Sequence, residues 1–135
     1  MTGKGPRKTV DDAHARARLL HAREFHESAR SLVILAQSQS YNGAVTLMVH
    51  AAIAYSDAVT AKARGVVNQQ DHRNAPRLLR EVLGSHLPDR QEKILRKLLG
   101  RKDEVNYGAR STPLAEGERL PVELAEFAAW AEGLA

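Results

Sequence analysis

The chain has 135 residues, which is enough to bury one hydrophobic core without disulfides or a metal ion. It contains no cysteine, and this excludes zinc ribbons, thiol nucleophiles and disulfide scaffolds. Twenty lysines and arginines against 16 acidic residues give a net charge of +4, which mildly favours nucleic acid over acidic partners. No apolar run approaches the roughly 20 residues of a membrane span, and the N-terminus lacks the apolar stretch of a signal peptide. We therefore expect a cytoplasmic protein with no membrane partner.

The chain begins with a short basic segment, residues 1–8, whose glycines, proline and lack of periodicity predict a disordered arm. A single domain over residues 9–135 follows. Thr9 and Asp12 resemble a helix N-cap and an acidic first turn, and no glycine or proline interrupts the chain from there to about Ser38. This pattern predicts a long first helix. Its polar first half is expected to project beyond the core toward a partner subunit.

The second predicted helix, from about 44 to 64, is apolar on most of its circumference and therefore belongs in the core. At 100° per residue, its few polar side chains fall within one narrow sector. These side chains are Thr46, His50, Asp57 and Arg64. A buried helix with one polar stripe needs a partner for that stripe, and Gly65 is a natural C-terminal stop for the helix.

The rest of the chain predicts a loop at 66–74, a short helix at 75–83, a helix at 89–107, another loop, and a last helix that starts at Pro121. The core candidates of the last helix are Leu124, Phe127 and Leu134. No segment alternates as a strand does. The predicted fold class is therefore all-α, an up-and-down bundle of four to five helices.

Arg101 is the most informative charge in the 89–107 helix, because it lies on the side that carries the apolar residues. A cation in such a place needs an anion or a cluster of acceptors, and Asp57 of the second helix is the obvious anion. An ion pair that fixes the helix register and a working site both remain open as interpretations. His50, on the same stripe as Asp57, is either hydrogen-bonded within the core or available as a base.

Known catalytic motifs are absent: there is no Walker loop, no Rossmann glycine fingerprint, no His-Glu-x-x-His and no Gly-x-Ser-x-Gly. Enzymes of the classical nucleotide-binding folds are therefore excluded. The six histidines lack companion carboxylates at metal-ligand spacing, so we predict no metal and no cofactor and interpret the histidines mainly as surface residues.

Four segments, in this order, resemble the HEPN superfamily of small helical-bundle proteins over roughly residues 24–110: ESARSLVILAQSQSYNGAV, VHAAIAYSDAV, DHRNAPRLL and RKDEVNY. Many members of that superfamily are metal-independent ribonucleases or toxins whose signature is an arginine, a polar residue, a few others and a histidine, sometimes followed by a tyrosine. In this sequence Arg101 matches the arginine, Lys102 the polar position, Asn106 the histidine position and Tyr107 the tyrosine. The general acid/base is therefore missing, because asparagine does not exchange a proton near neutrality.

The first functional hypothesis follows from this missing histidine. It is a HEPN-like homodimer that binds nucleotide or RNA as a regulatory module, with weak catalysis or none. The residues expected to bind are Asp57, Lys102 and Arg64. The family commonly assembles as a homodimer, and the net positive charge favours phosphate binding.

Two alternatives remain open. One is a metal-independent ribonuclease toxin of a toxin–antitoxin or defence system, in which Arg101, Asn106, Tyr107 and His50 line a cleft across a two-fold axis. The resemblance would then imply a nucleotidyltransferase antitoxin as a partner. The other is a structural interaction protein whose polar stripe only joins helices.

Overall fold

The computed structural model describes residues 6–36, 41–107 and 114–135, without the side chains of 36, 103–107 and 114–118. Its elements are β1 (Arg7–Thr9), α1 (Asp12–Ala36), α2 (Asn42–Arg64), β2 (Val66–Asn68), α3 (Ala75–Leu83), α4 (Asp89–Tyr107) and α5 (Leu114–Glu132). Single turns of 3₁₀-helix, His72–Asn74 and Gly84–His86, precede and follow α3. The predicted all-α bundle is confirmed.

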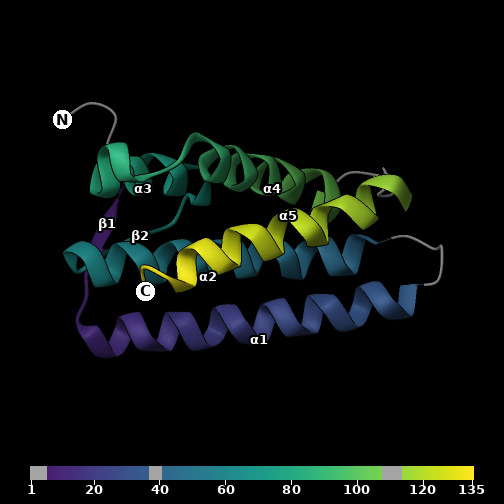
Figure 1. Cartoon of the computed structure of the whole chain (residues 1–135), viewed down its shortest axis with the longest axis horizontal. Helices are drawn as coiled ribbons and strands as arrows, with labels where there is room; N and C mark the ends of the chain where they lie inside the picture. The colour runs from purple at the N-terminus through teal and green to yellow at the C-terminus, as the bar shows by residue number, and fades with distance from the viewer. Residues whose placement is uncertain (1–5, 37–40, 108–113) are drawn as a thin grey trace.

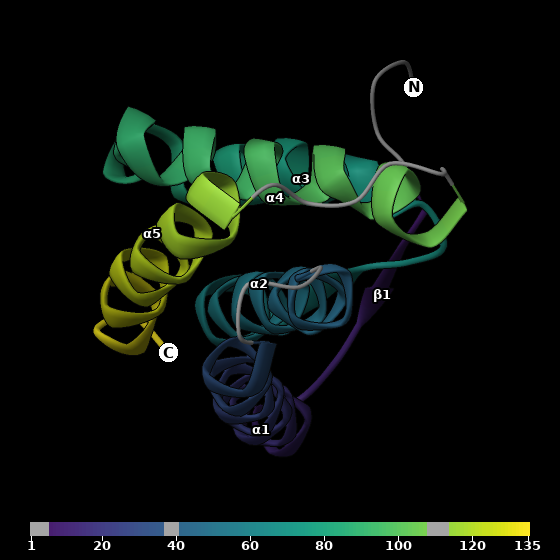
Figure 2. The same cartoon turned by 90° about the vertical axis from the view of Figure 1, so that its right-hand side faces the viewer.

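The central helix α2 contacts every other α-helix. Figures 1 and 2 show α1 along one side of it, α3 and α4 along the opposite side, and α5 on a flank. The core consists of α2 side chains such as Met48 and of fully buried residues from α4 and α5, among them Leu98 and Phe127. The expected burial of α2 is therefore confirmed, and its C-terminus is closed by Gly65 in the left-handed conformation.

By length and composition α2 would pass as a membrane span, with a mean hydropathy of 1.3 over its most apolar stretch. However, 78% of that stretch is buried inside the bundle. A core helix passes the same test, so the hydropathy of α2 is accounted for by its place at the centre of the fold.

Helix α1 lies along α2 for its whole length (Figure 1), with an alanine seam in the contact. Ala15, Ala22 and Ala29 are all buried and are spaced seven residues apart, so they form one line along the helix. Small side chains on that line let the two helices approach closely. The expectation that the first half of α1 projects beyond the core is therefore wrong.

The N-terminal segment differs in part from the prediction of a disordered arm over residues 1–8, of which residues 1–5 lie outside the described residues. Residues Arg7–Thr9 form a strand that pairs antiparallel with Val66–Asn68, with Lys8 opposite Val67. Val67 is buried against α1 and α2, and Arg7 forms an ion pair with Glu81 of α3. A three-residue strand is too short to show an alternating pattern, so periodicity does not predict it.

The last helix begins at Leu114 rather than at Pro121, which lies inside it. Proline removes one backbone hydrogen bond from the interior of a helix but is well tolerated in the first turn. A proline in a helical pattern therefore normally predicts the start of a helix. Leu120 and Leu124 on either side of it are buried, and this burial holds the helical path across the proline. Of the three predicted core residues of this helix, Leu124 and Phe127 are buried, whereas Leu134 is exposed.

Candidate anion-binding groove

The chain between β2 and α3 forms a tight turn that places His72 beside α4. Gln70 has a positive φ of 65°, and the Asp71 carboxylate then accepts a hydrogen bond from the backbone N–H of Arg73 at 3.0 Å. The Asn68 side chain donates to the backbone carbonyl of Asp71 at 2.8 Å. These local bonds fix the turn, because Asp and Asn side chains can replace backbone partners in short turns.

A cavity of about 220 Å³ opens between this turn and α4. Its lining residues are Asp71, His72, Arg73, Leu99 and Lys102. Lys102 Nζ lies 3.3 Å from His72 Nδ1, so the ammonium group donates toward a ring nitrogen. We call this space the His72–Lys102 cavity.

A second cavity of about 220 Å³ adjoins the first. Its lining residues are Arg73, Pro76, Arg96, Leu99 and Gly100. Because Arg73 and Leu99 line both spaces, the two cavities form one groove along α4. We call the second space the Arg73–Arg96 cavity, and the two together the groove.

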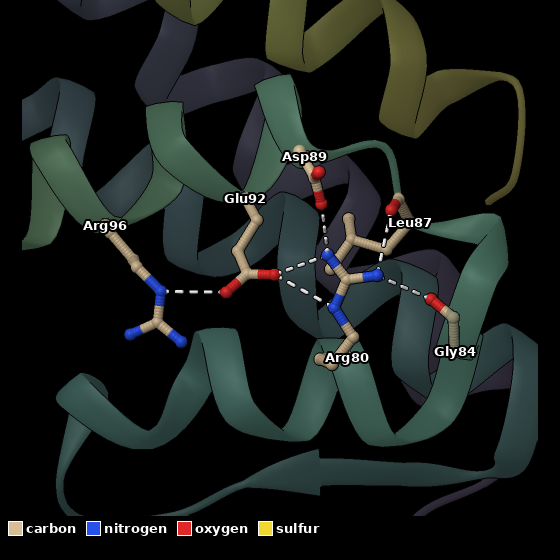
Figure 3. A network of polar contacts seen from close by, with 6 residues as sticks. All are labelled: Arg80, Gly84, Leu87, Asp89, Glu92 and Arg96. Carbon is tan, nitrogen blue, oxygen red and sulfur yellow. Dashed lines mark hydrogen bonds and ion pairs between the residues drawn. The ribbon is translucent and has the colours of Figure 1, made fainter.

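Arg96 is placed by a network of charges that begins on α3 (Figure 3). Glu92 accepts from Arg80 Nη2 at 2.6 Å through one oxygen and from Arg96 Nε at 2.9 Å through the other. Arg80 also donates to the backbone carbonyls of Gly84 and Leu87. The network thus joins α3 to the first turns of α4 and orients Arg96 at the groove.

Positive charge gathers around His72. The pKa of His72 lies below its ordinary value, first because the ring is half-buried and then because of Lys102, His50 and Arg18, against the opposing effect of Asp71. The pKa of His50 is also lowered, by burial and then by Lys102 and Arg18. Both rings are therefore neutral at pH 7, although cations lie close to them.

Asp57 is a mostly buried carboxylate that pairs with Arg18, one of the cations that act on His50 and His72. Its Oδ2 lies 3.1 Å from Nε of Arg18 on α1, and burial raises its pKa to about 6 against the opposing effect of Arg18. The predicted partner was Arg101, and this is a correction: α1, not α4, covers the face of α2 that carries Asp57. A helical pattern identifies the face but not the neighbour that covers it.

The predicted site residues have different places in the structure. Lys102 lines the groove, and His50 is near enough to affect His72. Arg101 is half-buried on the same helix but lies outside the lining, and Arg64 is exposed in the last turn of α2. Asn106 and Tyr107 belong to the backbone of α4, but their side chains lie outside the described part of the structure.

His72 is the groove residue that sequence reasoning missed, since it was interpreted as a surface histidine. Its partner Lys102 is 30 residues away, so no local spacing connects the two. The only available signal was the position of His72 in a turn between Asp71 and a helix start. Within the described residues, no group of three His, Asp or Glu side chains is arranged to hold a metal ion.

Comparisons of this chain with protein-family models and with curated proteins found no match. The chemistry of the groove is therefore the basis for a functional interpretation.

Proposed function

We propose that this chain is a HEPN-like homodimeric module that binds phosphate-bearing ligands, RNA or nucleotides, in the groove. The observation that carries the proposal is the contact between two bases, Lys102 and His72, in one cavity. Among the described residues, no carboxylate forms an ion pair with Lys102. A phosphate oxygen placed there accepts from the ammonium group and from the imidazole, and both bonds are charge-assisted.

The electrostatics of the surrounding residues support the same ligand class. Lys102 and Arg18 both lower the pKa values of His50 and His72, whereas the carboxylates are paired, Asp57 with Arg18 and Asp71 with Arg73. An approaching anion therefore meets a net positive region. The basic composition of the whole chain, at +4, acts in the same direction.

Binding of a fluorescent single-stranded oligoribonucleotide, measured by anisotropy at several salt concentrations, tests this proposal. Lys102→Gln is expected to weaken binding about tenfold and to make the salt dependence shallower by about one phosphate contact. Lys93→Gln is the matched control, because Lys93 is an exposed lysine on the same helix outside the groove. Equal effects of the two substitutions, or no binding by the wild type, would contradict the proposal.

A metal-independent ribonuclease is the second candidate, and the pair of neutral histidines beside Lys102 favours it. A neutral imidazole can accept the proton of a ribose 2′-hydroxyl as that oxygen attacks the adjacent phosphorus. The bond from phosphorus to the 5′-oxygen of the next nucleotide then breaks, which leaves a 2′,3′-cyclic phosphate, and the 5′-oxygen takes a proton from the imidazolium so formed or from water. Incubation of mixed RNA with the protein in EDTA tests this candidate. Cleavage by the wild type that is lost in His72→Gln and in His50→Gln would replace the binding proposal by catalysis, and Arg101→Ala tests the residue to which the HEPN resemblance gives that role.

The homodimer rests on apolar residues that the monomer leaves exposed on the second half of α1. Ile34 and Leu35 are 74% and 67% exposed, and Leu32 is exposed beside them. Surfaces of this kind mark contacts with other chains. We expect a dimeric mass in light scattering for the wild type and a monomeric mass for Leu35→Glu, whereas Val122→Glu on α5 should leave the mass unchanged. A monomeric wild type would exclude the homodimer.

A further inference from the structure

The Arg73–Arg96 cavity differs in chemistry from the cavity beside it. Its floor is apolar and is formed by Leu99, Pro76 and the exposed face of Gly100. Its other lining residues are two arginines whose charges are already neutralised. This cavity is therefore not a second anion site, although it is continuous with one.

Both arginines are held by carboxylates. Arg73 donates through Nε and Nη2 to the two oxygens of Asp71, at 3.1 and 3.2 Å. Arg96 donates through Nε to Glu92, which Arg80 holds from the other side (Figure 3). These ion pairs hold the edge of each guanidinium group, and the side chains of Arg73 and Arg96 remain 78% and 55% exposed. A planar, positively charged surface of this kind stacks on aromatic rings.

Gly100 leaves space in the floor of the cavity. A Cβ built on Gly100 meets nothing within 4 Å, and the residue lies in the interior of α4. Glycine in a helix interior costs about 1 kcal/mol relative to alanine, and no close packing contact at this position requires it. The space over Gly100 is open to a ligand.

We propose that the Arg73–Arg96 cavity is a nucleobase subsite, so that the groove holds one nucleotide unit. The phosphate lies in the cavity that His72 and Lys102 line, and the base lies over Leu99 and Gly100 against the guanidinium groups. This inference rests on the proposed phosphate binding. It adds that the ligand carries a nucleobase and says which cavity holds that base. One cavity of about 220 Å³ is smaller than the roughly 300–1,000 Å³ of typical small-molecule sites, whereas the two joined cavities reach that range.

Calorimetric titration with three probes tests the subsite: inorganic phosphate, ribose 5-phosphate and adenosine 5′-monophosphate. The wild type is expected to bind the nucleotide about tenfold more tightly than ribose 5-phosphate, because stacking of one base contributes roughly that factor or more. Gly100→Leu fills the cavity and should remove this advantage, so that the variant binds the nucleotide no more tightly than it binds ribose 5-phosphate. Arg96→Gln changes an exposed position and is not expected to prevent folding. It should also reduce the preference for the nucleotide over ribose 5-phosphate. Lys102→Gln should weaken the binding of all three probes.

The outcomes separate this inference from the function on which it rests. Equal affinity of the wild type for the nucleotide and for ribose 5-phosphate would exclude the base subsite and leave phosphate binding intact. A nucleotide advantage that survives in both Gly100→Leu and Arg96→Gln would also exclude it. If none of the probes and no RNA binds, the proposed function itself fails.

Discussion

The two ends of α4 use charge in opposite ways. At its start, in the region that Figure 3 shows, Arg80 contacts the carboxylates of Asp89 and Glu92 together with two backbone carbonyls. We call this region the Arg80 corner. Near the other end, Lys102 contacts a second base, His72. Arg80, which holds the fold together, is matched by anions within the chain, whereas Lys102 in the groove has no ion pair with a described carboxylate. Substitutions at the two ends should therefore act on different properties.

The largest effect is expected at Asp57, the mostly buried carboxylate of α2 that pairs with Arg18. Its pKa is about 6 in the folded chain and about 4 in an unfolded one, so folding between these pH values takes up a proton. The stabilisation is fully present below about pH 4 and is lost as the pH rises through 6. The shift corresponds to about 3 kcal/mol at about 1.4 kcal/mol per unit.

Urea unfolding at pH 4.5 and pH 7.5 measures this contribution. The free energy of unfolding of the wild type, taken relative to Asp57→Asn, should decrease between the two pH values. Asp12 is an exposed aspartate and provides the control. The free energy of unfolding of the wild type relative to Asp12→Asn should be nearly the same at the two pH values. A wild type that becomes more stable than Asp57→Asn as the pH rises would show that Arg18, rather than burial, controls the Asp57 carboxyl.

At the Arg80 corner, Arg80→Ala should lower the free energy of unfolding by about 2–3 kcal/mol, because partly buried carboxylate and carbonyl groups lose their donor. Arg96→Ala removes the exposed outer member of the same network and should cost less than about 1 kcal/mol. Denaturant unfolding of the two variants measures both losses in the free energy of unfolding and shows whether that of Arg80→Ala is the larger. Equal losses would mean that the network contributes only as a set of surface ion pairs.

The bundle could be predicted because its signals are local. The apolar circumference of α2 and its stop at Gly65 follow from residues that are neighbours in the sequence, and both are confirmed. The pairs that build the site are not local: Arg18 and Asp57 are 39 residues apart, and His72 and Lys102 are 30 apart. The resemblance to the HEPN superfamily points to Lys102, whereas no pattern in the sequence points to His72. The periodicity of the sequence predicts on which face of a helix a residue lies, but only the packing of the helices determines which element contacts that face.

Replacement of glycine by alanine should change the free energy of unfolding in opposite directions at Gly84, in the Arg80 corner, and at Gly100, in the groove. Gly84 has φ 56° and ψ −127° in the turn that Arg80 holds, so Gly84→Ala should cost about 1–2 kcal/mol. Gly100 is helical with open space around it, so Gly100→Ala should stabilise the protein by about 0.5–1 kcal/mol. Thermal unfolding of the two variants checks the signs. Destabilisation by Gly100→Ala would show that the helix needs a glycine there for packing.

The smallest effect on stability is expected at Lys102. Lys102→Gln should change the free energy of unfolding by less than about 0.5 kcal/mol, since no described carboxylate loses a partner. The substitution should nevertheless raise the pKa values of His72 and His50, because the Lys102 charge lowers both. NMR titration of the histidine rings checks this, with Lys97→Gln as control because Lys97 is paired with Glu123. Unchanged histidine titration would place the Lys102 charge away from the groove.

The pairing of β1 with β2 sets an order in which the protein can assemble during synthesis. β1 is made first but has no strand to pair with until residue 68 has emerged, after both α1 and α2. Both helices are therefore synthesised before the strands can close, and the closed strands, with the bond from Gln69 N–H to the Pro6 carbonyl, adjoin the turn that carries His72. The residues of that wall of the groove leave the ribosome before those of α4, so the strand pair and the turn are able to close before the second wall has been synthesised.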